Sequence, residues 1–286
     1  MHKVGYLQGR RIQGDIGPNN LDPITGALGK LYAPAQSLTG YEQGILEATL
    51  VQHYALGSKL EYLDQTYRYS HADAARQLRA GYGCYPLMTY VETGVPPVGA
   101  LINTTTLTLT AVGAPAADEF AEGTLVVNGG GAANATRYRI RSNTAVAAGL
   151  FTVTVYDPFI FAVTGAMVCT CFHSPWWNIH CMRQEIIDAA APNWQQVSFS
   201  VVPNFNVPLD CFFWGQTKGL CICIPSGGTE GVAINERMMV FDTNGAVMRW
   251  SYAAADVYQL AGYILPVTTA GAIPVAGGVP VMLALE

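Results

Sequence analysis

Charged residues are scarce in this sequence. Asp, Glu, Lys and Arg together make up 12% of its 286 residues, about half of the usual share of roughly 25%. A soluble monomer normally keeps a charged surface, whereas large obligate protein interfaces are apolar. Since the hydrophobic fraction is 50%, the shortage of charge predicts that much of the surface contacts other protein.

Other absences disfavour whole classes of partner. The net charge is −5, so no general basic field attracts nucleic acid. The sequence has no run of about 18 apolar residues that would span a bilayer. Its start, MHKVGYLQGRRIQGD, has no apolar stretch of the kind found in secretory signals. We therefore expect no nucleic acid and no membrane as partners, and synthesis in the cytoplasm.

Catalytic and cofactor motifs are also missing. The glycine-rich stretch PSGGTEG, residues 225–231, lacks the Lys-Ser/Thr pair of a phosphate-binding loop. No G-x-S-x-G nucleophile elbow occurs, and Ser, His and Asp do not cluster in a triad-like way. The sequence predicts a protein that is not an enzyme, with no catalytic residues and no cofactor.

The seven cysteines are an odd number without a secretory context, so most are expected to be reduced. Two C-x-C pairs raise the possibility of zinc. The candidate ligands are Cys169, Cys171, Cys221, Cys223, Cys181, His173 and His180. Structural zinc sites usually have two to four residues between their cysteines, whereas C-x-C on a strand places both thiols on one face. Buried core thiols are the favoured interpretation, with no metal bound; zinc and a disulfide are the alternatives.

The pattern along the chain predicts a mainly β protein, a β-sandwich or β-barrel with an extended N-terminal arm and one short helix. Residues 1–44 are rich in Gly and Pro without a strand or helix period, which favours the arm. Residues 45–100 form a connecting strand and the short helix, which we place at 71–81 before Gly81. Residues 101–286 form the β domain, interrupted by an inserted Trp/His-rich segment, 172–208.

Alternating apolar and polar residues predict the individual strands. TTTLTLTAV places Leu107 and Leu109 on one face, and LFTVTVYDP does the same from Phe151 onward. KLEYLDQTYRYSHA, from Lys59, is typical of an aromatic-rich strand. Asn244-Gly245 between apolar runs predicts a β-hairpin.

Three arginines occupy alternate positions in GTLVVNGGGAANATRYRIRS, residues 123–142. On a strand, Tyr138 and Ile140 face inward, and Arg137, Arg139 and Arg141 face outward. They can form a solvated strand face whose stems cover apolar surface. Alternatively, they grip carboxylates across a subunit boundary, because arginine binds carboxylates in a bidentate manner and is enriched at interfaces. Our hypothesis is the interface.

A second candidate interface is the aromatic set Trp176, Trp177 and Trp194. Tryptophan in an irregular segment most often fills a subunit interface. Stacking on sugars is the alternative.

Four stretches, in order, resemble a family of tailed-bacteriophage virion structural proteins of the capsid decoration (cement) type. LEYLDQTYRYSHADAA resembles the family's LGDRxFRYAxAGxxA-like segment. AEGTLVVNGGGAANATRYRIRSNTAV resembles its GxLVVNDGxGxGxxYRIxSNxA block, and FTVTVYDPFIFAVT its LYDPxxxAL strand. FWGQTKGLCICI and the residues after it resemble its C-terminal half. The resemblance covers residues 57–286.

The resemblance implies a non-enzymatic protein on the outer surface of a phage capsid, made in the host cytoplasm. Its expected partners are the major capsid protein and further copies of itself, as a homotrimer at three-fold positions of the shell. The alternative is a receptor- or glycan-binding tail fibre or spike subunit, or a minor tail component.

Overall fold

The structure is a computed structural model, and it divides the chain into two compact units. Unit 1 comprises residues 1–87 and 176–286, and unit 2 comprises residues 88–175. Residues are described with their side chains over 43–87, 92–96, 99–129, 135–181, 198–226, 237–242, 244–250, 259–265 and 278–286, and as backbone strands over 2–7, 10–15 and 30–33. The sequence placed the start of the β domain at residue 101. In the structure, unit 2 is a continuous segment that is inserted between the two parts of unit 1.

The described residues are mainly β, as the sequence predicted, and contain no helix. The strands of unit 1 are β1 (His2–Leu7), β2 (Arg10–Asp15), β3 (Lys30–Ala33), β4 (Lys59–Tyr62), β5 (Gln65–His71), β6 (Cys84–Pro86), β13 (Ile179–Cys181), β14 (Phe212–Cys223), β15 (Met238–Phe241), β16 (Val247–Arg249), β17 (Leu260–Ile264) and β18 (Val279–Ala284). The strands of unit 2 are β7 (Glu92–Gly94), β8 (Thr106–Thr110), β9 (Thr124–Asn128), β10 (Ala135–Asn143), β11 (Leu150–Val155) and β12 (Val168–Phe172).

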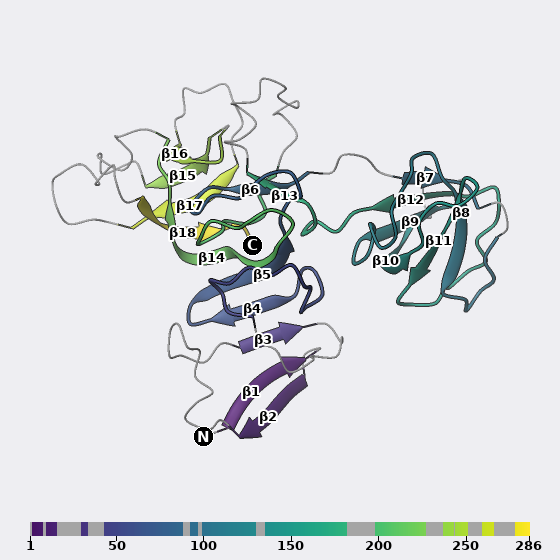
Figure 1. Ribbon diagram of the computed structural model, residues 1–286, viewed down its shortest axis with the longest axis horizontal. Helices are drawn as coiled ribbons and strands as arrows, with labels where there is room; N and C mark the ends of the chain where they lie inside the picture. Colours follow the sequence, from purple (N-terminus) through teal and green to yellow (C-terminus); the bar gives the residue numbers. More distant parts are fainter. Residues whose placement is uncertain are drawn as a thin grey trace. The chain divides into compact units, whose positions relative to one another are not determined.

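Unit 1 is organised around one long sheet of ten strands in the order β16-β15-β17-β18-β14-β5-β4-β3-β1-β2 (Figure 1). Its central pair joins strands far apart in sequence, since β5 pairs antiparallel with β14. The stretch expected to form one aromatic-rich strand from Lys59 is a hairpin, with β4 and β5 joined at Leu63, whose φ is 55°. The predicted hairpin at Asn244-Gly245 is confirmed by the antiparallel pair β15–β16, and Gly245 has a φ of 76°.

The N-terminal residues, predicted to form an extended arm without strand pattern, contain three strands. β3 pairs antiparallel with β4, and β1 pairs with both β3 and β2. These three strands are the last of the ten-stranded sheet, with β3 next to β4 and β2 at the edge. Backbone hydrogen bonding to an open sheet edge needs no side-chain alternation, which is why the sequence did not reveal them.

The predicted helix at residues 71–81 is wrong. Backbone N–H groups in this stretch donate to distant segments: that of Ala72 to Cys211 O at 2.8 Å, and that of Leu78 to Val207 O at 3.0 Å. Both side chains are fully buried in a cluster with strand residues. Long-range backbone bonds and burial therefore outweigh the helix propensity of Ala, Gln, Leu and Arg.

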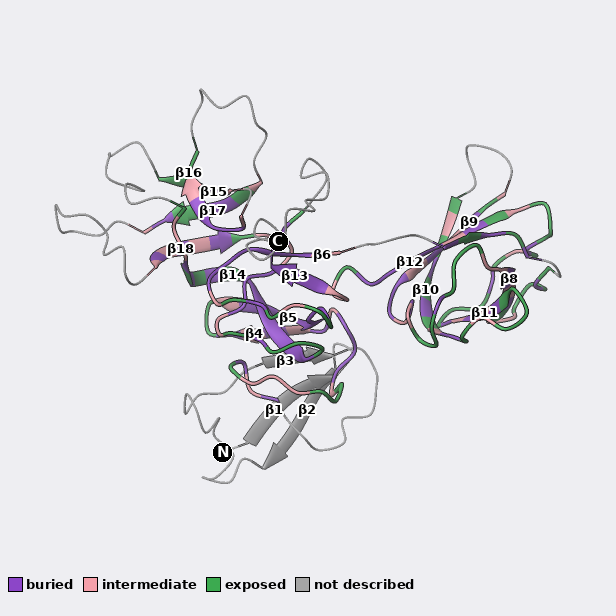
Figure 2. Cartoon of the chain, turned by 45° about the horizontal axis from the view of Figure 1, so that its top comes forward, coloured by how far each residue is buried: buried purple, intermediate pink, exposed green. Residues whose placement is uncertain are grey.

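Unit 2 is a curled sheet of six strands in the order β7-β12-β9-β10-β11-β8. The predicted alternation is confirmed: Leu107 and Leu109 of β8 are buried, as is Phe151 of β11. The inward-facing side chains of β8, β9, β10, β11 and β12 form one core cluster, and Figure 2 shows the alternation of buried and exposed residues along these strands. The two outer strands also approach each other, because Thr110 N–H donates to Val95 O at 3.1 Å.

Candidate functional site

The arginines of β10 lie where the sequence predicted them. Arg137, Arg139 and Arg141 are exposed, and Tyr138 and Ile140 are buried in the unit 2 core. A β-bulge falls between Ile140 and Ser142 in the pairing with β11. Arg141 is therefore the extra residue of the bulge.

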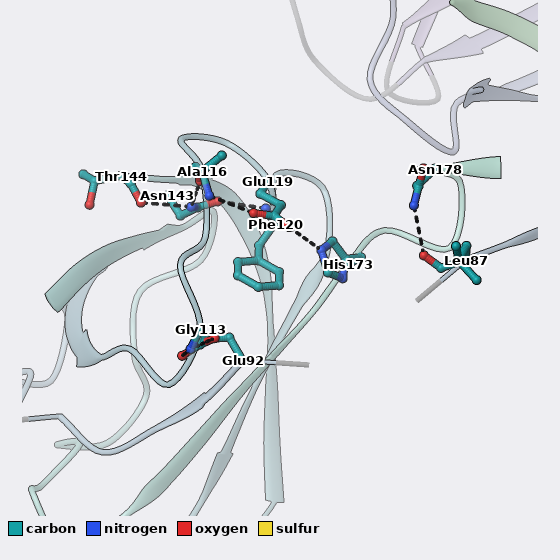
Figure 3. Close-up of polar contacts among 10 residues, drawn as sticks. All are labelled: Leu87, Glu92, Gly113, Ala116, Glu119, Phe120, Asn143, Thr144, His173 and Asn178. Atoms are coloured by element: carbon teal, nitrogen blue, oxygen red, sulfur yellow. Dashed lines mark hydrogen bonds and ion pairs between the residues drawn. The ribbon is translucent and has the colours of Figure 1, made fainter. Parts of the chain in front are cut away.

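The bulge changes which later residue faces inward. Asn143 is buried instead of Ser142. The Asn143 side chain accepts the Phe120 N–H at 2.8 Å and donates to Ala116 O at 2.8 Å (Figure 3). Asn143 thus fixes the loop before β9. The bulge that turns its side chain inward could not be predicted from the sequence.

Arg139 differs from its two neighbours because unit 2 itself binds it. Its Nη2 lies 2.5 Å from Oε2 of Glu122, whose side chain is buried. Its guanidinium lies over the ring of Tyr156, 5.7 Å from the centroid, and the Tyr156 hydroxyl donates to Glu122 Oε1. A buried carboxylate is costly without a partner, so Arg139 stabilises the unit. Sequence reasoning missed Glu122, which lies 17 residues earlier.

Arg137 and Arg141 have no such anchor. Within the part of the chain that the structure describes, no ion pair involves either guanidinium. Both extend from a strand whose other face is fixed in the core. They are the two cations of β10 that can bind an external carboxylate in the bidentate manner.

The predicted tryptophans of the inserted segment pack on unit 1 itself. Trp176 lies against Gly57, where an added Cβ would stand 2.6 Å from its Cδ1, and its ring lies 5.5 Å from the Arg68 guanidinium carbon. Trp177 stacks on His71 with ring centroids 4.0 Å apart. Both rings are half-buried. Trp194 lies outside the described residues.

Two histidine–carboxylate pairs join segments of unit 1 that are distant in sequence. His71 Nε2 lies 3.1 Å from Asp210 Oδ1, and His180 Nε2 lies 3.2 Å from Asp73 Oδ1. Burial lowers the pKa of His71, against the opposing effect of the Asp210 carboxylate. The neutral imidazole is thereby favoured in the folded protein. Neither pair was predicted, because the residues meet only through the pairing of distant segments.

Unit 2 has a comparable pair. His173 Nε2 lies 3.2 Å from Glu119 Oε1, and the His173 ring packs 4.6 Å from that of Phe120 (Figure 3). Nearby, the buried Glu92 carboxylate accepts the backbone N–H groups of Val112 and Gly113. These carboxylates hold loops in place.

All seven cysteines are free thiols, and their predicted burial is confirmed. Cys169 and Cys171 lie in the unit 2 core, whereas Cys221 and Cys223 lie in a unit 1 core. Burial raises the pKa of Cys169 to about 11. Among the described residues, no three His, Cys, Asp or Glu side chains form a group that could hold a metal ion.

No family model matches the chain, and no curated protein or solved structure is significantly similar to it. Among the described residues, no helix is long and apolar enough to cross a membrane.

Proposed function

We propose that this chain is a non-enzymatic virion structural protein that binds the outside of a tailed-phage capsid and cements adjacent capsomers. The resemblance of four ordered sequence blocks supports the proposal. Its mainly β structure and its scarcity of charge agree with a protein whose surface contacts other protein.

The observation that carries the proposal is the pair of exposed arginines, Arg137 and Arg141, on a strand whose opposite face is buried in the unit 2 core. Each can grip a carboxylate of the major capsid protein. A ligand that binds only the assembled shell stabilises it by mass action. A homotrimer at a three-fold position would engage several capsid subunits at once, and the high effective concentration would make modest contacts durable.

We also propose that unit 2 is a closed β-barrel. Support comes from the bond between Thr110 N–H and Val95 O, which joins the two outer strands of the sheet. Its single inward core agrees with closure. A closed sheet has no open edge and holds β10 rigidly, as a gripping surface requires.

The test is binding of the full chain to purified capsid shells. We expect Arg137→Gln/Arg141→Gln to weaken binding at least tenfold while leaving the circular dichroism spectrum unchanged. Leu63→Gln, at an exposed hairpin tip in unit 1, is the control that should bind normally. If the arginine variant bound shells as tightly as the wild type, the proposal that Arg137 and Arg141 bind the capsid would be refuted.

The copy number of the chain in purified virions tests the location. A ratio to the major capsid protein near one, or a simple fraction of one, agrees with decoration of the whole shell. A handful of copies would place the chain in the tail and contradict the proposal.

The second candidate is a receptor- or glycan-binding fibre or spike subunit. It is favoured by the half-exposed Trp177 ring, which stacks on His71 beside the exposed Asp210 carboxylate. A tryptophan face with an adjacent carboxylate is a common arrangement for stacking on and hydrogen bonding to a ligand. Glycan-array binding that is lost in Trp177→Ala would favour this function over decoration.

A further inference from the structure

Five large apolar side chains form a continuous row across one end of the ten-stranded sheet, from β14 through β18, β17 and β15 to the residue after β16. Leu220 of β14 is paired with Met282 of β18, and Met282 with Tyr263 of β17. Tyr263 is paired with Met238 of β15. Trp250 follows β16, and its N–H donates to Met238 O at 2.9 Å. Directly paired residues point to the same face of a sheet, so the five side chains are lateral neighbours.

This row lies on the face opposite the core. The residues that alternate with it, such as Cys221, Val281 and Met239, are buried in the unit 1 core. Four members of the row are exposed, among them Tyr263 by 52%, Met238 by 47% and Trp250 by 46%, and Met282 is half-buried. Figure 2 shows the mixture of exposed and half-buried residues along these strands.

A second, shorter row runs beside the first. Ile222 of β14 is exposed and is paired with the half-buried Pro280 of β18. On β14, the nearest charged side chain on this face is Lys218, two residues before Leu220. The apolar face, defined as Leu220, Ile222, Met238, Trp250, Tyr263, Pro280 and Met282, therefore contains no charge.

The size of the apolar face can be compared with known interfaces. Even if each of the seven side chains had the area of an aromatic one, about 200 Å², these partly exposed residues would offer at most roughly 600 Å² of apolar surface. That is at the upper end for the largest patch on a monomer, about 300–600 Å². It also approaches the contribution of one partner to a stable interface, about 800 Å².

We infer that the apolar face packs against a second copy of this chain. A copy supplies an equally apolar and uncharged surface, and sheets pack face to face through such surfaces about 10 Å apart. Because the seven residues of the apolar face are uncharged, two copies can meet through them without placing like charges together. Interfaces between identical chains are also more apolar than those between proteins that separate.

The inference rests on the proposed function only for the expectation that copies associate; a face that packs against the same face of a copy gives a two-fold dimer, in place of the proposed homotrimer. It assigns self-association to unit 1 and leaves Arg137 and Arg141 of unit 2 for the capsid. The two ideas are tested separately, because self-association is measured on the free chain without shells.

The experiment is sedimentation velocity of the full chain over a wide concentration range. We expect the wild-type chain to associate, and Met238→Glu/Tyr263→Glu to raise the dissociation constant at least tenfold, because two paired carboxylates would face those of the other copy. The matched control is Leu50→Glu/Leu63→Glu, which places two charges at exposed apolar positions elsewhere in unit 1. It should associate like the wild type.

Cross-linking covers the case in which the glutamate variant does not fold. Since all seven native cysteines are buried, Tyr263→Cys introduces an accessible thiol. A short bismaleimide should link Tyr263→Cys chains into dimers but not Leu63→Cys chains. A monomeric wild-type chain, or association unchanged by the glutamates and no cross-link at position 263, would overturn the inference. If that monomer still bound shells, the proposed function would stand.

Discussion

The two units are built from the chain in opposite ways. Unit 2 is one continuous segment, residues 88–175, in which β9 pairs with the next strand β10 and even the most distant pairing, β7 with β12, stays within the segment. Unit 1 combines residues 1–87 with 176–286, and its central pair β5–β14 joins segments separated by some 150 residues. The strand patterns were accurate in unit 2, whereas the errors fell in unit 1. Local pairing leaves its signal in local sequence, and distant pairing does not.

The same contrast appears in the aromatic cores. Unit 1 packs Trp214 against Tyr69 and Tyr54 with centroids near 5 Å, the residues coming from three separate segments. Unit 2 packs Phe151 among residues of its own short segment. We therefore expect the two units to unfold separately, so that a substitution in the core of one unit lowers the stability of that unit alone.

The largest expected effect is the loss of a core aromatic. Phe151→Ala and Trp214→Ala should each cost about 3–5 kcal/mol, because the removed ring leaves a cavity. Hydrogen exchange followed by mass spectrometry should locate the loss of protection in unit 2 for Phe151→Ala and in unit 1 for Trp214→Ala. Loss of protection in both units from either substitution would show that the comparison is wrong and the units are one cooperative structure.

A smaller effect on stability is expected from substitutions of the β10 arginines. They compare, within unit 2, an arginine that pairs with a buried carboxylate and one that does not. Arg139→Ala should cost about 1–3 kcal/mol, since it leaves the buried Glu122 carboxylate without its cation. Arg137→Ala, two residues away on the same face, is the control and should stay within about 0.5 kcal/mol of the wild type. Urea unfolding measures both. Equal effects would mean that Glu122 does not depend on Arg139.

The smallest expected effect is the pH dependence of unit 1. Burial lowers the pKa of His71 below its usual value, so the folded state binds fewer protons than the unfolded state once the pH falls below about 6.5. Stability should fall as the pH decreases from there to the folded pKa, by at most about 1.4 kcal/mol per pH unit. The charged groups facing His71 are Asp210 and Asp73.

His71→Gln removes this contribution, so its stability should change less between neutral and mildly acidic pH than that of the wild type. The slope is the readout, because loss of the stacking on Trp177 lowers stability at every pH. An identical slope in both proteins would exclude His71 as the titrating group.

Some side-chain orientations could be predicted from the sequence, and some contacts could not. The outward direction of Arg137 and Arg139 and the burial of Cys169 and Cys171 followed from a period of two, which any strand imposes. Sequence reasoning failed for the stretch around Ala72, where a helix-like composition forms long-range bridges. It also missed the carboxylates at His71 and Arg139, because ion pairs between distant segments have no fixed spacing.

The sequence by itself determined that the protein is mainly β, which side chains of β8, β10 and β11 face the core, and that its surface is poor in charge. These depend on local alternation and composition. Only the tertiary structure decided which strands are neighbours and that a bulge at Arg141 changes the direction of the β10 side chains after it. It also brought five apolar side chains into one row: Leu220, Met282, Tyr263, Met238 and Trp250. The reason is physical: the order and register of strands are set by hydrogen bonds between segments far apart in the chain, and no single segment encodes its distant partner.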